Sequence, residues 1–270
     1  MQRLLGLRHL PHVTTISRML READERSVRK LRELLRELVL ERVAERGLRR
    51  ITLDFDGSVQ STKRRAEGTA VGFNKKKKGA RSYYPLFCVL AQTGQVLDFL
   101  HRAGNVHDSN GARKFILQCV CYAQTALPGV IIEVRMDSAF FSDEIVDALD
   151  RAGIEMSISV PFERFVELKT HCHMDYVPVR TRMGNATYLL ASLFAFNLIR
   201  ELQMKVHAPQ RSTNRKRTAL WAFERVETIR HTILQRAGRL SMPSGRHVLT
   251  FCAGKDLKQR VLHILQALAA

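Results

Sequence analysis

Two aspartates, Asp56 and Asp137, stand at positions where carboxylates could hold divalent metal ions. Asp56 lies on one face of an alternating strand predicted over 50–59, and Asp137 follows a β-branched strand predicted over 130–136. Carboxylates on neighbouring strands repel one another, and two Mg²⁺ or Mn²⁺ ions about 3.5–4 Å apart relieve that repulsion. One ion then activates an attacking water or 3′-hydroxyl group, and the other stabilises the leaving oxygen. Asp54 shares a face with Asp56 by period two, so it is a further ligand or a partner of the ligands.

The elements that must position these residues follow a recognisable order. Periodicity predicts strands over 50–59, 85–91, 96–102, 130–136 and 154–160, and helices over 109–125 and 142–152. Residues 1–47 and the chain beyond 161 are expected to be mainly helical, with a loop at 209–217 and a short strand at 247–251. Three strands, a helix, a strand, a helix and a strand is the order of the α/β ribonuclease-H-like fold. That fold is a mixed five-stranded sheet with flanking helices, whose first and fourth strands lie side by side in the middle.

The charge of the chain indicates a polyanionic partner. Forty-four Lys and Arg against 26 Asp and Glu leave a formal net charge of +18, and nucleic acid is the commonest polyanion that basic proteins bind. Residues 63–81 carry eight basic groups and one acidic group, residues 203–260 thirteen and three, and residues 98–169 seven and eleven. The stretch 63–81, rich in Gly and Lys, is expected to be a loop. Lys75 to Lys78, between Gly72 and Gly79, are expected to act as a mobile clamp on phosphate, with a solvated loop as the alternative. The residues expected to contact DNA are Lys75, Lys76, Lys77, Lys78, Arg81, Arg215, Lys216 and Arg217.

An anionic membrane is the rival partner, and the longest apolar stretch tests it. That stretch, 186–199, is interrupted by polar residues and is shorter than the roughly 18 residues that span a bilayer. It is therefore expected to be a core helix, and no membrane partner is predicted. Five cysteines, an odd number in mostly apolar surroundings, fit reduced thiols in a cytoplasmic protein.

Four ordered motifs resemble those of DDE transposases of bacterial insertion sequences, most closely the subgroup whose third motif is Tyr-Arg-Glu-Lys. They are Leu-Asp-Phe-Asp-Gly-Ser (53–58), Ala-Val-Gly-Phe-Asn before the lysine run (70–74), Gly-Asn-Val-His-Asp (104–108) and Arg-Met-Asp-Ser-Ala-Phe (135–140). The resemblance implies that Asp56 and Asp137 match the first two metal-binding aspartates of the family, which use Mg²⁺ or Mn²⁺. It also implies strand cleavage at element ends, joining to a target, and double-stranded DNA as the partner of a homodimer.

The third carboxylate of the resembled family has no direct match. In the family a long insertion follows the fifth strand, and a helix then carries Tyr, Arg, Glu and Lys, with the Lys seven positions after the Glu. Here Phe162 stands seven positions before Lys169. An internal deletion that joined two similar Glu-Leu-Lys stretches would explain this, and the chain is also expected to be short at its N-terminus. Glu163 is the candidate substitute, with Glu167 one helical turn later.

Three parts and three functions follow. The parts are a helical segment 1–47 from a DNA-binding or dimerisation domain, a ribonuclease-H-like core 48–170 without the usual insertion, and a helical region 171–270. The functions are an active DDE transposase, a non-catalytic DNA-binding remnant of one, and a ribonuclease-H-like nuclease that does not transpose. Metal-dependent nicking of duplex DNA separates the remnant from the other two. Joining of a cut end to target DNA separates the transposase from the nuclease.

Overall fold

The structure is a computed structural model of the 270-residue chain. It describes residues 11–63, 65–72, 77–107, 110–137, 140, 142–158, 176–210, 219–235, 238–246, 248–251 and 254–269. No helix within these ranges is both long enough and apolar enough to cross a membrane.

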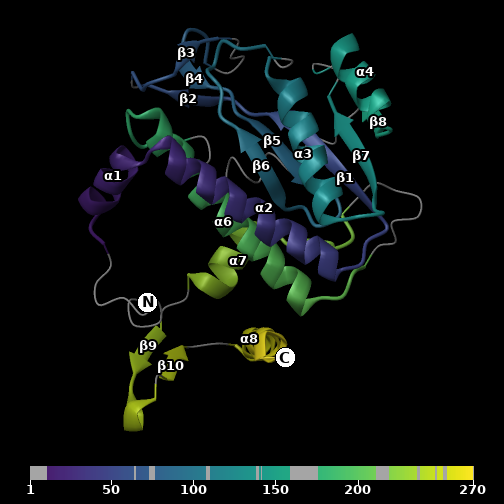
Figure 1. The fold of residues 1–270 in the computed structure, drawn as a ribbon. Coiled ribbons are helices and arrows are strands. Elements are labelled where there is room, and N and C mark those ends of the chain that lie inside the picture. The colour runs from purple at the N-terminus through teal and green to yellow at the C-terminus, as the bar shows by residue number, and fades with distance from the viewer. Residues whose placement is uncertain are drawn as a thin grey trace.

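A mixed five-stranded sheet forms the centre of the molecule (Figure 1). In spatial order its strands are β6 (Val96–Leu100), β5 (Leu86–Leu90), β1 (Arg50–Gly57), β7 (Ile131–Met136) and β8 (Glu155–Ile158). Strand β5 is antiparallel to both β1 and β6, whereas β1 with β7 and β7 with β8 are parallel. The predicted ribonuclease-H-like fold is confirmed, because the first and fourth of these strands in chain order are neighbours in the middle of the sheet.

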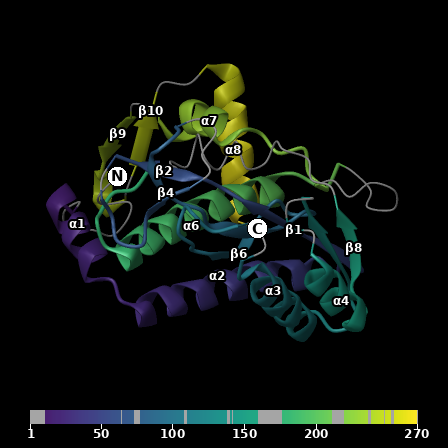
Figure 2. The same ribbon diagram turned by 90° about the horizontal axis from the view of Figure 1, so that it is seen from above.

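Helices cover both faces and one edge of this sheet. Helices α3 (Ala112–Ala126) and α4 (Asp143–Arg151) bury the apolar face of β1 and β7, and α6 (Arg182–Val206) covers the opposite face of β5 and β6. Helix α2 (Glu25–Glu45) follows the edge strand β6 and contacts both α3 and α6. Figure 2 shows α2 and α6 running side by side. The short helix α1 (Val13–Glu22) precedes α2 and contacts α6.

The helix ends lie where local chemistry predicts them. The side chain of Asp24 accepts a hydrogen bond of 2.7 Å from the backbone N–H of Ser27 and so caps the start of α2. Gly47, which follows α2, has a φ of 59°, the left-handed conformation typical of a helix end. The predicted core helix is confirmed, because the apolar stretch 186–199 lies within α6 and buries Leu189 and Leu193 against the sheet.

A second, three-stranded sheet corrects part of the prediction of a loop over 63–81, since residues 70–71 and Arg81 lie in its strands while most of the other described residues of the stretch are loop. Its strands, in the order β2-β4-β3, are β2 (Gln60–Thr62), β4 (Arg81–Tyr83) and β3 (Ala70–Val71). Strand β2 follows β1 and β4 precedes β5, so their pairing continues the antiparallel ladder of β1 and β5 beyond the central sheet. Segments of two or three residues are too short to show an alternating pattern, so they become strands through their partners.

The C-terminal region is less helical than predicted. Helix α7 (Val226–Ile229) leads into a π-helical turn (Arg230–Leu234), and α8 (Lys255–Ala269) ends the described chain. Between them β9 (Gly238–Ser241) and β10 (Val248–Phe251) form an antiparallel hairpin. Strand β10 confirms the short strand predicted at 247–251. Its partner β9 has the sequence Gly-Arg-Leu-Ser and carries no strand signal of its own.

Candidate active site

Asp56 and Asp137 occupy corresponding positions on two neighbouring strands. In the parallel register of β1 and β7, Asp54 pairs with Arg135 and Phe55 pairs with Met136. Asp56 and Asp137 are the residues that come next on each side. Asp56 lies near the carboxyl end of β1, and Asp137 directly follows the carboxyl end of β7. Neighbouring strands are about 4.8 Å apart, so the two carboxylates start from backbones close enough to bind one or two cations between them.

Alternation along β1 and β7 determines the face from which these side chains project. Phe55 and Met136, the residues immediately before the two aspartates, are buried in the core beneath α3 and α4. Successive side chains of a strand point to opposite faces, so the aspartates belong to the other face. Asp56 is half-buried and Asp137 is exposed, which leaves the pair accessible to a large substrate.

Asp54 is a partner of Arg135. The Nε of Arg135 donates to Oδ1 of Asp54 at 2.6 Å, and its Nη2 donates to Oδ2, so both carboxylate oxygens are engaged. The side chain of Asp54 is only 4% exposed and that of Arg135 only 8%. Of the two roles open to Asp54 from its sequence, ligand or partner of the ligands, the geometry favours the second. The signal in the sequence was Arg135 itself, a cation two residues before Asp137 and therefore on the same face.

Gly57, Tyr84 and Arg102 surround the end of β1, and none of the three was predicted as a site residue. The backbone N–H of Gly57 donates to Oδ1 of Asp56 at 2.7 Å. A Cβ at Gly57 would lie 2.4 Å from the ring of Tyr84, so glycine is required for this close packing. The guanidinium of Arg102 lies over the same ring, 5.1 Å from its centroid, and its Nε donates to the carbonyl oxygen of Tyr84. These contacts fix the backbone next to Asp56.

Two glycines of the sequence motifs seat the small sheet against the turn that follows β6. A Cβ at Gly72 would lie 1.7 Å from the carbonyl oxygen of Gly104, and a Cβ at Gly104 would lie 2.2 Å from Oγ of Ser82. Only glycine permits such an approach of two backbones. The base of the basic segment is therefore held against the central fold.

The predicted DNA contacts are only partly within the described residues. Lys77 and Lys78 lie in the exposed connection between β3 and β4. Arg81 on β4 donates from Nε to Oγ1 of Thr69 at 3.0 Å and from Nη2 to its carbonyl oxygen, so its guanidinium braces the hairpin. The other predicted contacts, Lys75, Lys76, Arg215, Lys216 and Arg217, lie outside the described residues.

The carboxylates of the site suit a hard divalent cation. Asp56 and Asp137 supply oxygen ligands, the donor type that Mg²⁺ and Mn²⁺ prefer. Within the described ranges no group of three His, Cys, Asp or Glu residues could hold a metal ion. Glu163 and Glu167, the candidates for the third carboxylate, lie in the undescribed range 159–175. The donor chemistry of the two aspartates therefore fits such a cation.

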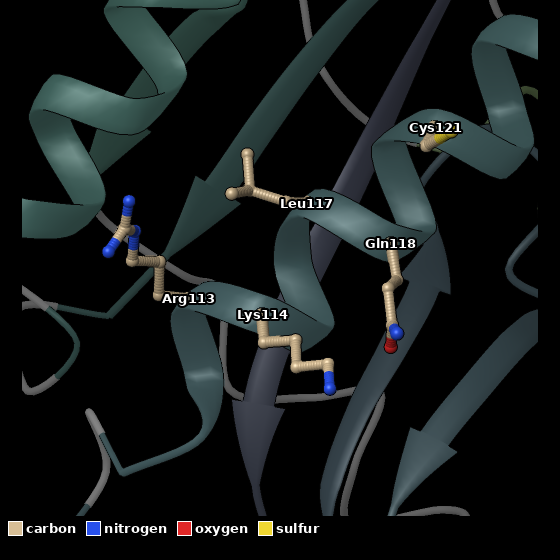
Figure 3. Close-up of a pocket in the computed structure, with 5 residues that line it drawn as sticks. All are labelled: Arg113, Lys114, Leu117, Gln118 and Cys121. Carbon is tan, nitrogen blue, oxygen red and sulfur yellow. The ribbon is translucent and has the colours of Figure 1, made fainter.

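A shallow depression elsewhere on the surface does not belong to this site. It lies on the outer side of α3, measures about 390 Å³, and is lined by Arg113, Lys114, Leu117, Gln118 and Cys121 (Figure 3). Helix α3 covers the apolar face of β1, whereas the aspartates project from the opposite face. No carboxylate lines the depression, so it offers no ligand to a divalent cation.

His101, just after β6, is a buried histidine that packs rather than catalyses. The centroid of its ring lies 4.3 Å from that of Tyr83, with the two rings tilted by 40°, and neither ring nitrogen has a hydrogen-bond partner within the described part of the chain. Burial, with a smaller effect from the nearby Arg182, lowers the pKa of His101 to about 3. The imidazole is therefore neutral at physiological pH, and its environment is apolar.

Solved integrases and transposases resemble the chain at low sequence identity. An intasome of simian T-cell lymphotropic virus, solved with PP2A regulatory subunit B56 gamma, is 18% identical, covers 75% of this chain and has a TM-score of 0.35; 62% of its own chain is matched. The catalytic domain of Mos1 mariner transposase is 10% identical over 72% of this chain and 95% of its own, with a TM-score of 0.34. The HTLV-2 integrase catalytic core, solved with magnesium, is 13% identical over 63% and 92%, with a TM-score of 0.32. At such TM-scores the fold assignment rests on the strand order alone.

Sequence comparison identifies the family. No curated protein matches the chain. One family model, described as transposase DDE domain group 1, matches residues 2–167. This range is more than half of the chain, and it contains Asp56, Asp137 and all five strands of the central sheet. The chain therefore belongs to the group 1 family of transposase DDE domains.

Proposed function

We propose that this protein is a DDE transposase of the bacterial insertion-sequence type, which cleaves DNA strands and joins them to a target. The observation that carries the proposal is the parallel register of β1 and β7, whose last pair, Phe55 with Met136, immediately precedes Asp56 and Asp137 at the carboxyl ends of the two strands. Membership of the transposase DDE domain family supports it. The three-part division at residues 47 and 170 belongs to the same proposal.

In this proposal Asp56 and Asp137 hold two Mg²⁺ or Mn²⁺ ions. Bound there, the cations would activate the attacking oxygen and stabilise the leaving oxygen of a phosphodiester. Gly57 orients the carboxylate of Asp56 through its N–H, and Tyr84 keeps the adjacent backbone in place. Glu163 is the proposed third ligand, with Glu167 as the alternative. The internal deletion inferred from the stretch 160–169 is the reason that neither matches the family motif directly.

The proposed partner is double-stranded DNA, both the element ends and the target, bound by a homodimer in the cytoplasm. Support for DNA comes from the net charge of +18 and from exposed Lys77 and Lys78 between β3 and β4. Three cysteines in the described residues, Cys88, Cys119 and Cys121, are free thiols, as expected of a protein in a reducing compartment.

Nicking of supercoiled plasmid DNA tests the proposal. The unmodified chain should nick the plasmid in Mn²⁺ and not in EDTA, and Asp56→Asn or Asp137→Asn should abolish nicking, since an amide replaces a carboxylate ligand. Asp147→Asn is the matched control, because this aspartate lies exposed on α4 with its partner Arg151 3.9 Å away. Nicking that survives both active-site substitutions would refute the assignment of these residues.

The same assay distinguishes the rival functions. DNA binding without any Mn²⁺-dependent nicking would identify a non-catalytic remnant. Nicking without the joining of a cut end to a second DNA would identify a ribonuclease-H-like nuclease. Glu163→Gln and Glu167→Gln, tested in parallel, show which glutamate completes the site, because only loss of the true ligand should abolish nicking.

A further inference from the structure

The face of β1 and β7 that carries the aspartates is polar from Thr52 and Glu133 onward. Three side chains of β1 on this face are Thr52, Asp54 and Asp56, and those opposite them on β7 or following it are Glu133, Arg135 and Asp137. Four of the six residues, Thr52, Asp54, Glu133 and Arg135, are buried. Central strands of this kind are usually apolar on both faces, so this buried row of polar side chains requires an explanation.

In the middle of this row, Arg135 of β7 and Asp54 of β1 form a bidentate ion pair between the two strands. The Nε and Nη2 of Arg135 donate to the two oxygens of Asp54, in the direction of the strand-to-strand register pair. A bidentate guanidinium–carboxylate pair is planar, so it constrains orientation as well as distance. It therefore fixes both the spacing and the stagger of β1 and β7 two residues before the aspartates.

The preceding pair of the row, Thr52 and Glu133, connects the same two strands. Oγ1 of Thr52 donates to Oε2 of Glu133 at 3.1 Å. The side-chain amide of Gln92, from the turn between β5 and β6, donates to Oγ1 of Thr52 at 3.1 Å and accepts from the Thr52 N–H at 2.9 Å. Hydrogen bonds therefore connect this row to the turn between β5 and β6 at one end, and the row leads to Asp56 and Asp137 at the other.

Stability alone does not explain the ion pair. Replacing a buried ion pair by apolar side chains of similar volume is often neutral or stabilising, and the other face of these strands shows that apolar packing is available. A pair that is dispensable for stability but geometrically strict suits a positioning role, because metal ligands must be held to within about 0.5 Å.

We infer that Arg135 and Asp54 are positioning residues that align Asp56 with Asp137 for metal binding; this inference rests on the proposed function. Arg135 holds the carboxylate of Asp54 away from the cations and locks the two strands in register. The aspartates one step farther along each strand are thereby presented as a matched pair of ligands.

The test compares Mn²⁺ affinity with thermal stability in the full chain. Mn²⁺ binding is followed by electron paramagnetic resonance, and unfolding by circular dichroism. Asp54→Leu/Arg135→Met removes both members of the ion pair together, so neither is left buried without its partner, and the melting temperature should stay close to that of the parent. The affinity for Mn²⁺ should nevertheless fall by about 10- to 100-fold, the usual effect of removing a residue that orients metal ligands. Arg135→Lys keeps the charge but loses the fork, and its affinity should fall by about tenfold or more.

The control is Arg50→Met/Glu155→Leu, which removes an exposed ion pair between β1 and β8 at the opposite end of β1. It should leave Mn²⁺ affinity unchanged. Parent-like Mn²⁺ affinity in both Asp54→Leu/Arg135→Met and Arg135→Lys overturns the positioning role alone. Absence of Mn²⁺ binding by the parent, or binding that persists in Asp56→Asn and Asp137→Asn, overturns the proposed function and the positioning role with it.

Discussion

His101 shows how strongly one buried side chain can link stability to pH. Its pKa is lowered to about 3, first by burial and then by Arg182, whereas an exposed histidine titrates near 6.5. Between these values the unfolded chain binds a proton that the folded chain refuses. The stability that depends on neutral His101 is therefore fully present above about pH 6.5 and is lost as the pH falls toward 3.

We expect His101→Phe to reduce this acid sensitivity, since a phenyl ring suits the aromatic site beside Tyr83. The parent should lose up to about 1.4 kcal/mol of unfolding free energy per pH unit through this one group, and the variant should lose correspondingly less. Urea unfolding at pH 7 and pH 4.5 measures the difference. Equal losses in the two proteins would show that His101 takes up its proton as readily in the folded chain as in the unfolded chain.

The pairing of Asp54 with Arg135 was not predicted from the sequence, although Asp56 and Asp137 were predicted as a pair. Alternation placed Asp54 and Asp56 on one face because it is a local property of β1. The partner Arg135 is 81 positions away, and it reaches Asp54 only through the register of two strands joined by a long excursion. Tyr84 was missed for the same reason, because its contact with Gly57 depends on how β5 pairs with β1.

At the scale of elements, α2 is fastened to the edge strand β6 by a buried charge cluster. Asp98 accepts hydrogen bonds from Nε of Arg32 at 2.7 Å and from Nη1 of Arg36 at 2.9 Å, and its side chain is 1% exposed. Arg36 also lies over the ring of Tyr122 on α3, 4.2 Å from its centroid. The Asp98 carboxylate thus connects α2 to β6, and Arg36 connects α2 to α3.

Asp98→Ala should destabilise the protein strongly, because it leaves Arg36 and much of Arg32 buried without a counter-charge. The expected loss is about 3–5 kcal/mol, measured as a shift of the urea unfolding midpoint. Asp147→Ala on the exposed side of α4 is the control and should change the unfolding free energy by less than about 0.5 kcal/mol. A small effect of Asp98→Ala would mean that α2 is held by its apolar contacts alone.

The central strands could be predicted from sequence, and the smaller ones could not. Strands β1 and β7 bury one complete face, so their apolar residues recur at the period of a strand. Strands β2, β3 and β4 are at most three residues long and exist because the β1–β5 ladder extends past the sheet. A period cannot be read from so few residues, and the lysine-rich composition between them favoured a loop.

At the scale of the whole molecule, the net charge of +18 predicts DNA binding that weakens steeply with salt. Each neutralised phosphate contributes about −0.9 to the slope of log K against log salt concentration. Lys77→Ala/Lys78→Ala should therefore make the slope shallower by about 1.8 and weaken binding to all sequences alike. Lys114→Ala on the outer side of α3 is the control, and an unchanged slope in the Lys77/Lys78 variant would exclude these lysines as phosphate contacts. Fluorescence anisotropy over a salt series measures both.

The small sheet grows directly out of the strand that ends beside Asp56. A hydrogen bond of 2.9 Å from the N–H of Ser58 to the carbonyl oxygen of Pro85 bridges the point where the two sheets meet. On the proposed function, the length of the paired strands β2 and β4 would set the distance along a duplex between a phosphate bound by Lys77 and Lys78 and the bond that is cut. The three residues of β2 and of β4 span about 10 Å, close to three base-pair steps. The length of the small sheet would thus determine where the DNA is cut relative to the bound phosphate.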